Sequence, residues 1–305
     1  MKRLLIDFKN LLKETFNKAI DEDIITQGAA IAFYTIFSVA PLFILIIALG
    51  GIIYSEELIS TQLYDGLEEL LGPEMASTLE QFLQARSETD SGFLTTVIAT
   101  GLMLFGATTV INQLKIVLNS IWNVKTVKIH SVWHVLINRL LAFGMIILFS
   151  LLLIFSMIAE GLITFVSNFF YQIIPNVPLD VYLVFSEMST IVFAVLFFTL
   201  IFKILPDVHA RWKDVIIGAI VTTALFMLGK SLIGMYLTAD TIQASYRAAG
   251  SFVIFLIWVY YNIQIILLGA VFTQVYTQMF GGRILPYKFV ELKEIVGLKS
   301  KRSQN

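Results

Sequence analysis

Cysteine is missing from all 305 residues, and histidine occurs only three times. Without thiols the chain has no disulfide, no thiolate metal site and no cysteine nucleophile. Charged residues make up only 14% of the sequence, whereas an average soluble domain has about 25%. The formal net charge of −1 argues against a nucleic-acid-binding protein, whose domains are usually basic.

Sequence signatures of common enzyme sites are also missing. The chain has no Walker A string, no dinucleotide-binding glycine fingerprint and no GxSxG elbow. His130 and His134 are four residues apart, but the string HSVWH lacks the glutamate of the metalloprotease motif HExxH. We therefore predict no catalytic residue, no bound metal and no cofactor, and we expect that the protein is not an enzyme.

Apolar residues are in excess, at 57% of the chain, and 25 of them are Phe. Crossing about 30 Å of hydrocarbon takes a helix of about 20 mostly apolar residues. Six stretches are long enough, at residues 28–53, 92–111, 133–160, 181–204, 215–237 and 248–276. The fold class that we predict is an all-α membrane protein built as a six-transmembrane-helix bundle.

The distribution of basic residues gives these spans a direction. Almost all Lys and Arg residues fall in four segments on one side of the predicted bundle, at residues 2–18, 115–139, 203–213 and 283–302. The opposite side has only Arg86 and Arg247. Because basic loops stay in the cytoplasm, both termini are predicted to be cytoplasmic. An even number of spans agrees with this orientation.

Two segments outside the spans have their own character. Residues 1–23 place Leu11, Leu12, Phe16 and Ile20 on one helical stripe that Leu4, Leu5 and Phe8 extend, which predicts a cytoplasmic amphipathic helix. This helix either lies on the inner leaflet or packs on the ends of the spans. Residues 54–91 are acidic and predict an external helical hairpin, either a vestibule that collects cations or a plain solvated face. The domain layout is therefore a helix at 1–23, a six-span domain at 24–280 and a basic cytoplasmic tail at 281–305.

Three ionisable residues lie in the predicted spans, where such groups usually face a bundle interior or a wet cavity. They are Glu160 in span three, Glu187 in span four and Lys230 in span five. The predicted orientation puts Glu187 and Lys230 at a similar depth in the outer half of the membrane. The alternatives remain open: a shared polar cavity, or else a buried structural pair or a snorkelling Lys. The amides Asn262 and Gln264 in span six either line a solute path or join helices.

Several longer strings resemble one family. They are GAAIAFYTIFSVAPLFIL at 28–45, LNSIWNVK at 118–125, LIFKILPDVHARWKDVIIGAIVTTALFMLGKSLIGMYL at 200–237 and SYRAAGSFVIFLIWVYYNIQIILLGAVF at 245–272. In this order they are similar to the YihY/BrkB family of bacterial inner-membrane proteins. The resemblance covers most of the chain and implies a multi-pass protein of the bacterial inner membrane.

The resemblance also singles out residues. Lys230 falls on the Lys of the family's "GK" string, and two further strings supply a motif loop with Pro206, Asp207, Trp212, Asn119 and Trp122. The sequence departs from the family pattern at two places. Val271 stands where the family usually has Glu, and Arg247 stands where it often has Gly. Any role of the acidic group is therefore in doubt for this chain.

Family members were once labelled ribonuclease BN, some are called virulence or serum-resistance factors, and one relative is linked to moving a lipid A precursor. A ribonuclease or other hydrolase is the least favoured function here, since metal-assisted hydrolysis needs clustered carboxylates and histidines. A transporter or flippase-like protein for a lipid or small solute is favoured, with Glu187 and Lys230 on the head group and Arg247 at the outer mouth. The alternative is a non-catalytic scaffold for cell-envelope partners. Membrane lipids are the expected partners, and nucleic acid is not expected to bind. The sequence does not indicate whether the protein is a monomer or an oligomer.

Overall fold

The computed structural model describes residues 2–35, 38, 61, 93–126, 132–173, 179–237, 250–281, 285–286 and 290–292. Helices account for most of them. They are α1 (Lys2–Asp21), a helix at Ile24–Thr35, α5 (Phe93–Ile121), α6 (Val132–Ile173), α7 (Leu179–Ile204), α8 (Trp212–Leu237) and α10 (Gly250–Phe280). The predicted external hairpin at 54–91, apart from Thr61, and Arg247 lie outside the described residues.

Four described helices contain stretches that are long and apolar enough to cross a membrane. These are Leu136–Val166, Glu187–Ile204, Trp212–Ser231 and Phe255–Phe280, with 31, 18, 20 and 26 residues. They fall on predicted spans three to six. Most of the predicted first span lies outside the described residues, so the count of six stays a prediction.

α6 is longer than the sequence predicts. It contains 42 residues and is therefore about 63 Å long at the helical rise of 1.5 Å per residue. The span that was expected to end at Glu160 continues as helix to Ile173. The residues after Glu160 are mostly apolar and contain no proline before Pro175. Because a proline disfavours the helical conformation of the residue before it, the sequence contains no proline that would end the helix earlier.

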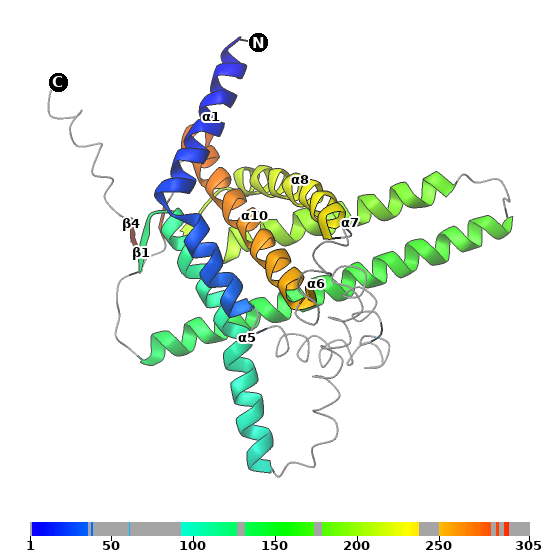
Figure 1. Cartoon of the computed structure of the whole chain (residues 1–305), viewed down its shortest axis with the longest axis horizontal. Coiled ribbons are helices and arrows are strands. Elements are labelled where there is room, and N and C mark those ends of the chain that lie inside the picture. The colour runs from blue at the N-terminus through cyan, green and yellow to red at the C-terminus, as the bar shows by residue number, and fades with distance from the viewer. Residues whose placement is uncertain are drawn as a thin grey trace.

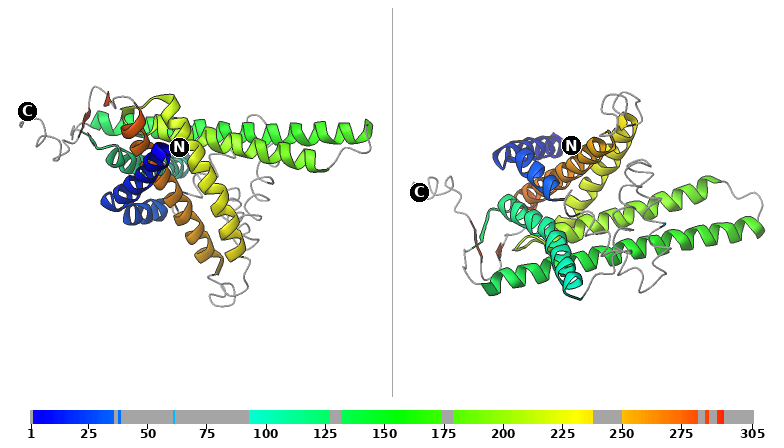
Figure 2. Two further views of the ribbon diagram at one scale, coloured as in Figure 1. Left: turned by 90° about the horizontal axis from the view of Figure 1, so that it is seen from above. Right: turned by 60° about the horizontal axis from the view of Figure 1, so that its bottom comes forward.

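The described helices diverge from a common end (Figures 1 and 2). α6 and α7 run side by side and project beyond the rest of the described chain, while α8 and α10 form a second pair that points elsewhere. α5 packs across α6, and α1 packs on α10. In a simple bundle the helices would be parallel along their whole length. The described helices instead separate beyond their common end.

We call the common end the junction and define it as residues 114–126, 198–219 and 267–281. It contains the ends of α5, α7 and α10 and the start of α8. Its core consists of large side chains that are almost fully buried, among them Trp122, Leu118, Ile201, Phe202 and Leu267. Such closely packed side chains stabilise this end through their van der Waals contacts.

Two short antiparallel ladders attach the tail to the junction. β1 (Val124–Thr126) pairs with β4 (Val290–Leu292), and β2 (Val208–His209) pairs with β3 (Leu285–Pro286). The sequence did not predict these strands, because two or three residues are too few to show an alternating pattern. The ladders bring the described tail residues 285–286 and 290–292 to the same end as the links that follow α5 and α7.

The N-terminal segment joins the same end. The Ser120 hydroxyl donates a hydrogen bond of 2.9 Å to the Glu22 carboxylate. α1 stops just before Glu22 because Asp23 takes a left-handed conformation (φ 46°), which Asp and Asn tolerate better than most residues. The Asp23 amide donates to the Ile20 carbonyl at 2.9 Å, and the Asp23 carbonyl accepts from Gln27 at 3.1 Å in the next helix. The C-terminal end of α1 therefore lies at the same end of the molecule as the junction.

α8 and α10 approach each other very closely through a reciprocal pair of residues. A Cβ atom added to Gly218 would overlap the Thr273 side chain, and one added to Gly269 would overlap Thr222. Each Thr hydroxyl donates to the carbonyl of the Gly one turn earlier in its own helix, at 2.7 Å for Thr222 and 2.6 Å for Thr273. Small residues spaced by four are a common means of close helix packing in membranes.

Candidate functional site

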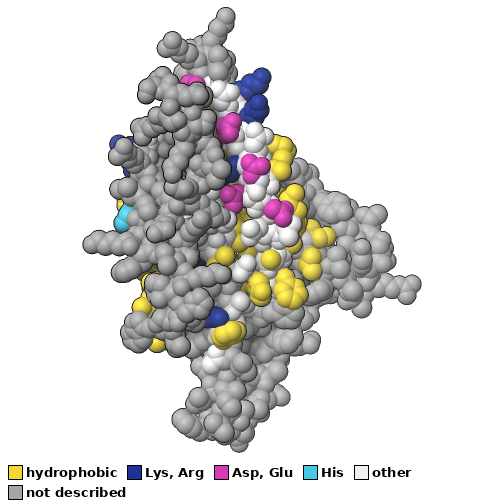
Figure 3. Space-filling model, turned by 90° about the vertical axis from the view of Figure 1, so that its left-hand side faces the viewer, with side chains coloured by type: hydrophobic (Ala, Val, Ile, Leu, Met, Phe, Trp, Pro, Cys, Tyr) yellow, Lys and Arg dark blue, Asp and Glu magenta, His cyan; other side chains and the backbone are white. Residues whose placement is uncertain are grey.

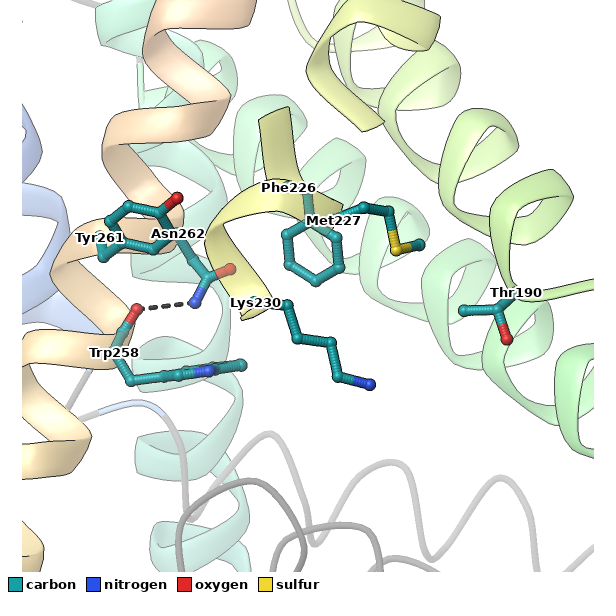
Figure 4. A pocket seen from close by; sticks show the side chains of 7 residues that line it. All are labelled: Thr190, Phe226, Met227, Lys230, Trp258, Tyr261 and Asn262. Atoms are coloured by element: carbon teal, nitrogen blue, oxygen red, sulfur yellow. Dashed lines mark hydrogen bonds between the residues drawn. The ribbon is translucent and has the colours of Figure 1, made fainter. Parts of the chain in front are cut away.

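A cavity of about 260 Å³ lies between α7, α8 and α10 (Figure 4). Its lining residues come from all three helices and are Thr190, Phe226, Met227, Lys230, Trp258, Tyr261 and Asn262. Three of the seven are aromatic, one is a thioether and one is a cation. The described lining of the cavity therefore combines apolar walls with one ammonium group.

Lys230 is the charged group of this cavity. Figure 4 shows its side chain extending from α8 toward the side of α7 where Thr190 lies. Within the described ranges, no carboxylate forms an ion pair with Lys230. A cation beside apolar walls in a membrane helix is costly unless an anion or water compensates it. The arrangement suits a ligand that has an anionic group and an apolar part.

The packing of α8 on α10 creates one wall of the cavity. A Cβ atom on Gly229 would overlap the Tyr261 hydroxyl, so only glycine lets this ring lie against α8 beside Lys230. On α10 the Asn262 amide donates to the Trp258 carbonyl at 2.7 Å. This bond fixes the Asn262 side chain, and Figure 4 shows Asn262, Trp258 and Tyr261 together on the α10 side.

The structure brings two of the predicted site residues together and separates others. Lys230 and Asn262 both line the cavity, whereas Glu160 and Glu187 are not among its described lining residues. All three ionisable residues are exposed. Glu187 lies one turn before Thr190 on α7, and it makes no ion pair with Lys230.

Gln264 lies elsewhere and joins helices. Its amide nitrogen is 3.3 Å from the carbonyl oxygens of both Ile24 and Ile25, so it connects α10 to the start of the Ile24–Thr35 helix. A Cβ atom on Gly28 would overlap the same amide. Of the two interpretations of the span-six amides, helix joining describes the contacts of Gln264.

The motif residues that the resemblance singled out meet at the junction. The Asn119 amide donates to Asp207 Oδ2 at 2.9 Å, and the Asp207 backbone amide donates back to Asn119 Oδ1 at 2.8 Å. The ammonium of Lys115 lies 3.0 Å from Asp207 Oδ1. We call Lys115, Asn119 and Asp207 the motif clamp. It ties the end of α5 to the link between α7 and α8.

The other motif residues surround this clamp. Trp122 and Pro206 are buried, while Trp212 is exposed at the start of α8 with the Lys203 ammonium 5.2 Å from its ring centre. The nearby Asp214 carboxylate accepts bonds of 3.1 and 3.2 Å from Arg211, and these bonds raise the pKa of Arg211 above its usual value. The motif loop is therefore a structural joint in the described residues rather than part of the cavity.

Arg139 makes polar contacts that the sequence did not predict. This residue was assigned to the basic link before the third span. It lies inside the apolar stretch of α6, and its Nη1 donates to Phe105 O at 3.0 Å and to the hydroxyls of Thr108 and Thr109 at 2.7 and 3.1 Å. Its guanidinium also lies 4.0 Å from the centre of the Phe105 ring. The adjacent residues Thr108 and Thr109 within an apolar helix could have indicated that α5 accepts hydrogen bonds from a cation.

Comparison with known proteins assigns the family. Residues 15–288 match the profile of the family described as virulence factor BrkB. The chain belongs to this family. The match confirms the resemblance seen in the sequence strings, and it extends from α1 to the tail residues of the β3 ladder.

Curated relatives of this BrkB-family protein are described as UPF0761 membrane proteins. The one from Mannheimia succiniciproducens is 26% identical over 289 residues, which cover 92% of this chain and 94% of the relative. The one from Idiomarina loihiensis is 24% identical over 225 residues, 72% of each chain. A third, from Saccharophagus degradans, is 25% identical over 88% of this chain and 58% of its own length. No solved structure matches the chain.

These findings establish a membrane protein of the BrkB family. The printed names of the relatives refer to membrane proteins and mention no reaction or transported compound. The metal-ligating residue types also fail to gather: the described residues hold no group of three or more His, Asp or Glu side chains suited to a metal ion. Function must therefore be argued from the cavity.

Proposed function

We propose that this BrkB-family protein is a transporter or flippase-like protein that binds the anionic head group of a lipid or small amphiphile at Lys230. One observation carries the proposal: an ammonium without a described counter-carboxylate lies in a cavity walled by Phe226, Met227, Trp258 and Tyr261. An anionic head group supplies the missing charge, and the aromatic walls accept the apolar part next to it.

The size of the cavity supports head-group binding rather than enclosure of a whole lipid. Pockets for drug-sized molecules are about 300–1,000 Å³, and this one is about 260 Å³. A phosphate-bearing head group fits such a volume, while acyl chains would stay in the bilayer. A protein that moves lipids is expected to bind the head group in this way while the acyl chains stay in the bilayer.

The proposal includes a membrane topology. We place six spans in a bacterial inner membrane, with both termini in the cytoplasm, because almost all basic residues belong to segments that leave the junction. The junction is then the cytoplasmic end of the bundle. Lys230 lies 18 residues after Trp212, the first residue of α8, or about 27 Å along the helix, which puts it toward the outer leaflet.

The experiment is a lipid-translocation assay with the full chain in proteoliposomes. Fluorescent phosphatidylglycerol and phosphatidylcholine are compared, and the fraction reached by an external quencher is followed over time. We expect Lys230→Ala to slow phosphatidylglycerol movement about tenfold, the effect of about 1.4 kcal/mol of lost binding, and Lys230→Arg to keep part of the rate. Lys213→Ala, on an exposed residue of the same helix, is the matched control.

Two results would count against the proposal. Full translocation of the anionic lipid by a folded Lys230→Ala variant excludes the cavity as its path. Absence of translocation by the unchanged protein for every lipid and small anion tested favours the alternative, a non-transporting scaffold.

A further inference from the structure

α1 is divided lengthwise into three faces, and the first of them packs on α10. Leu11, Thr15 and Ala19 are only 4%, 6% and 7% exposed. They are spaced by four residues and so form one stripe of the helix. Because this stripe is buried and α1 packs on α10, the direction in which the other faces point is set by packing within the protein.

The second face is apolar but has no cover among the described residues. Leu12, Phe16 and Ile20 are 49%, 65% and 61% exposed. Each of them follows a buried residue by one position, so they form a second stripe beside the first. The same character continues into the next helix, where Ile25 is 66% and Phe33 is 57% exposed. The exposed stripe thus leads directly into the predicted first span.

The exposed charges of α1 that the structure describes are sorted around this stripe by sign, while the half-buried Lys18 lies about 160° from Phe16, beside the acidic residues. At about 100° per residue, Lys9 and Lys13 lie about 20° and 60° from Phe16 around the helix axis. By the same measure Asp7, Glu14 and Asp21 lie about 140–180° away and form the third face. Figure 3 shows this side of the molecule, with Lys or Arg and hydrophobic side chains along one edge and acidic side chains in a row beside them.

We infer that α1 lies in the surface of an anionic bilayer leaflet, with Leu12, Phe16 and Ile20 at the acyl boundary and Lys9 and Lys13 on acidic lipid head groups. Helices of this kind insert an apolar face and keep basic side chains at the head-group level. Lys also suits this position because its hydrocarbon stem lies along apolar surface while the ammonium reaches the polar region. The acidic third face then points to water.

Charge also decides against a second copy of the chain as the partner. In a two-fold symmetric contact through this stripe, the same patch faces itself. Both copies would then bring Lys9 and Lys13 to one apolar contact, and four like charges gathered there repel each other. An anionic bilayer meets the same residues with opposite charge. This inference does not depend on the function of Lys230.

The absence of cysteine makes a direct test simple. Single cysteines at residues 12, 16 and 20, and in other variants at 10, 14 and 17, carry a nitroxide spin label in the full chain. The labelled protein is placed in vesicles of phosphatidylcholine with phosphatidylglycerol, and collisions with oxygen and with a water-soluble nickel chelate are measured. We expect labels at 12, 16 and 20 to favour oxygen and those at 10, 14 and 17 to favour nickel.

A label at residue 16 that meets nickel as freely as one at residue 14 would overturn the inference. Spin–spin broadening at residue 16 that disappears on dilution with unlabelled protein also overturns it, because the partner is then a second copy. A charge test completes the experiment: Lys9→Gln with Lys13→Gln is compared with Asn10→Glu with Asn17→Glu, which changes the net charge equally. The first pair should lose most of the oxygen preference at residue 16, and an unchanged preference would exclude anionic head groups.

Discussion

The junction and the Lys230 cavity are built in opposite ways, although both join α7, α8 and α10. At the junction, charged and amide groups are paired with each other, as in the motif clamp and the Arg211–Asp214 pair. At the cavity, Lys230 is the one charged group among the described lining residues, and no described carboxylate forms an ion pair with it. The helices converge at the first region and diverge beyond it (Figure 2).

This difference separates two roles along the same helices. Polar groups whose hydrogen bonds are all made within the protein stabilise the contact between the helices. They have no free donor or acceptor for a ligand. Lys230 is an exposed residue, and within a membrane a charge that lacks a protein partner has to be compensated by something else, such as water or a ligand. The paired end is therefore expected to determine stability, and the unpaired end is expected to determine function.

The largest effect should come from breaking the close packing of α8 on α10. Gly218→Leu inserts a side chain where even a Cβ atom overlaps Thr273. We expect a loss of about 3 kcal/mol in stability, the upper end of the usual range for overpacked cores. Thermal unfolding of the purified protein in detergent measures it.

The matched control for this substitution is Gly144→Leu. A Cβ atom on Gly144 meets nothing within 4 Å, so this change should leave the melting temperature almost unchanged. Equal melting temperatures for the two variants would show that the helices are not in the close contact described.

A smaller loss is expected from removing the centre of the motif clamp. Asp207→Ala leaves the Lys115 ammonium and the Asn119 amide without their shared partner. Hydrogen bonds to charged groups are worth about 1.5–3 kcal/mol, and we expect a destabilisation in this range. Asp21→Ala, at the exposed end of α1, serves as the control in the same unfolding experiment. If the motif clamp contributed nothing to stability, the two variants would have the same free energy of unfolding.

The smallest effect is expected at Gln274, which is the exception within the paired end. This residue is fully buried, and neither its amide nitrogen nor its amide oxygen has a hydrogen-bond partner among the described residues. Because replacing an unsatisfied polar group by an apolar one of similar size is neutral or favourable, Gln274→Leu should stabilise the protein by up to about 1 kcal/mol. Clear destabilisation in the unfolding assay would instead reveal a bound water or ligand at this amide.

Lys230 and the apolar stretches were recognisable from sequence because both signals are local. A lone Lys within an apolar run is conspicuous whatever the fold, and about 20 apolar residues in succession are enough to predict a helix that crosses a membrane. Asn119 and Asp207 of the motif clamp could be listed only through the family resemblance, and Lys115 stood out only as one of the loop charges. Asn119 and Asp207 are 88 residues apart, and no periodicity connects them.

Arg139 shows where the local approach fails. Its position near the start of a predicted span made it look like a loop charge, but its partners Phe105, Thr108 and Thr109 lie on another helix. The length of α6 was underestimated for a related reason. Glu160 was read as the end of a span, although a single exposed carboxylate does not interrupt helical hydrogen bonding.

By itself, the sequence determined that this is a helical membrane protein, which segments carry positive charge and which residues share a face of α1. These properties follow from composition and from the 3.6-residue period, and both are local. Only the tertiary structure decided that Leu11, Thr15 and Ala19 face α10 while Leu12, Phe16 and Ile20 stay exposed, and that Lys230 meets Asn262 but not Glu187. Such choices depend on contacts between segments far apart in the chain, which local periodicity does not specify.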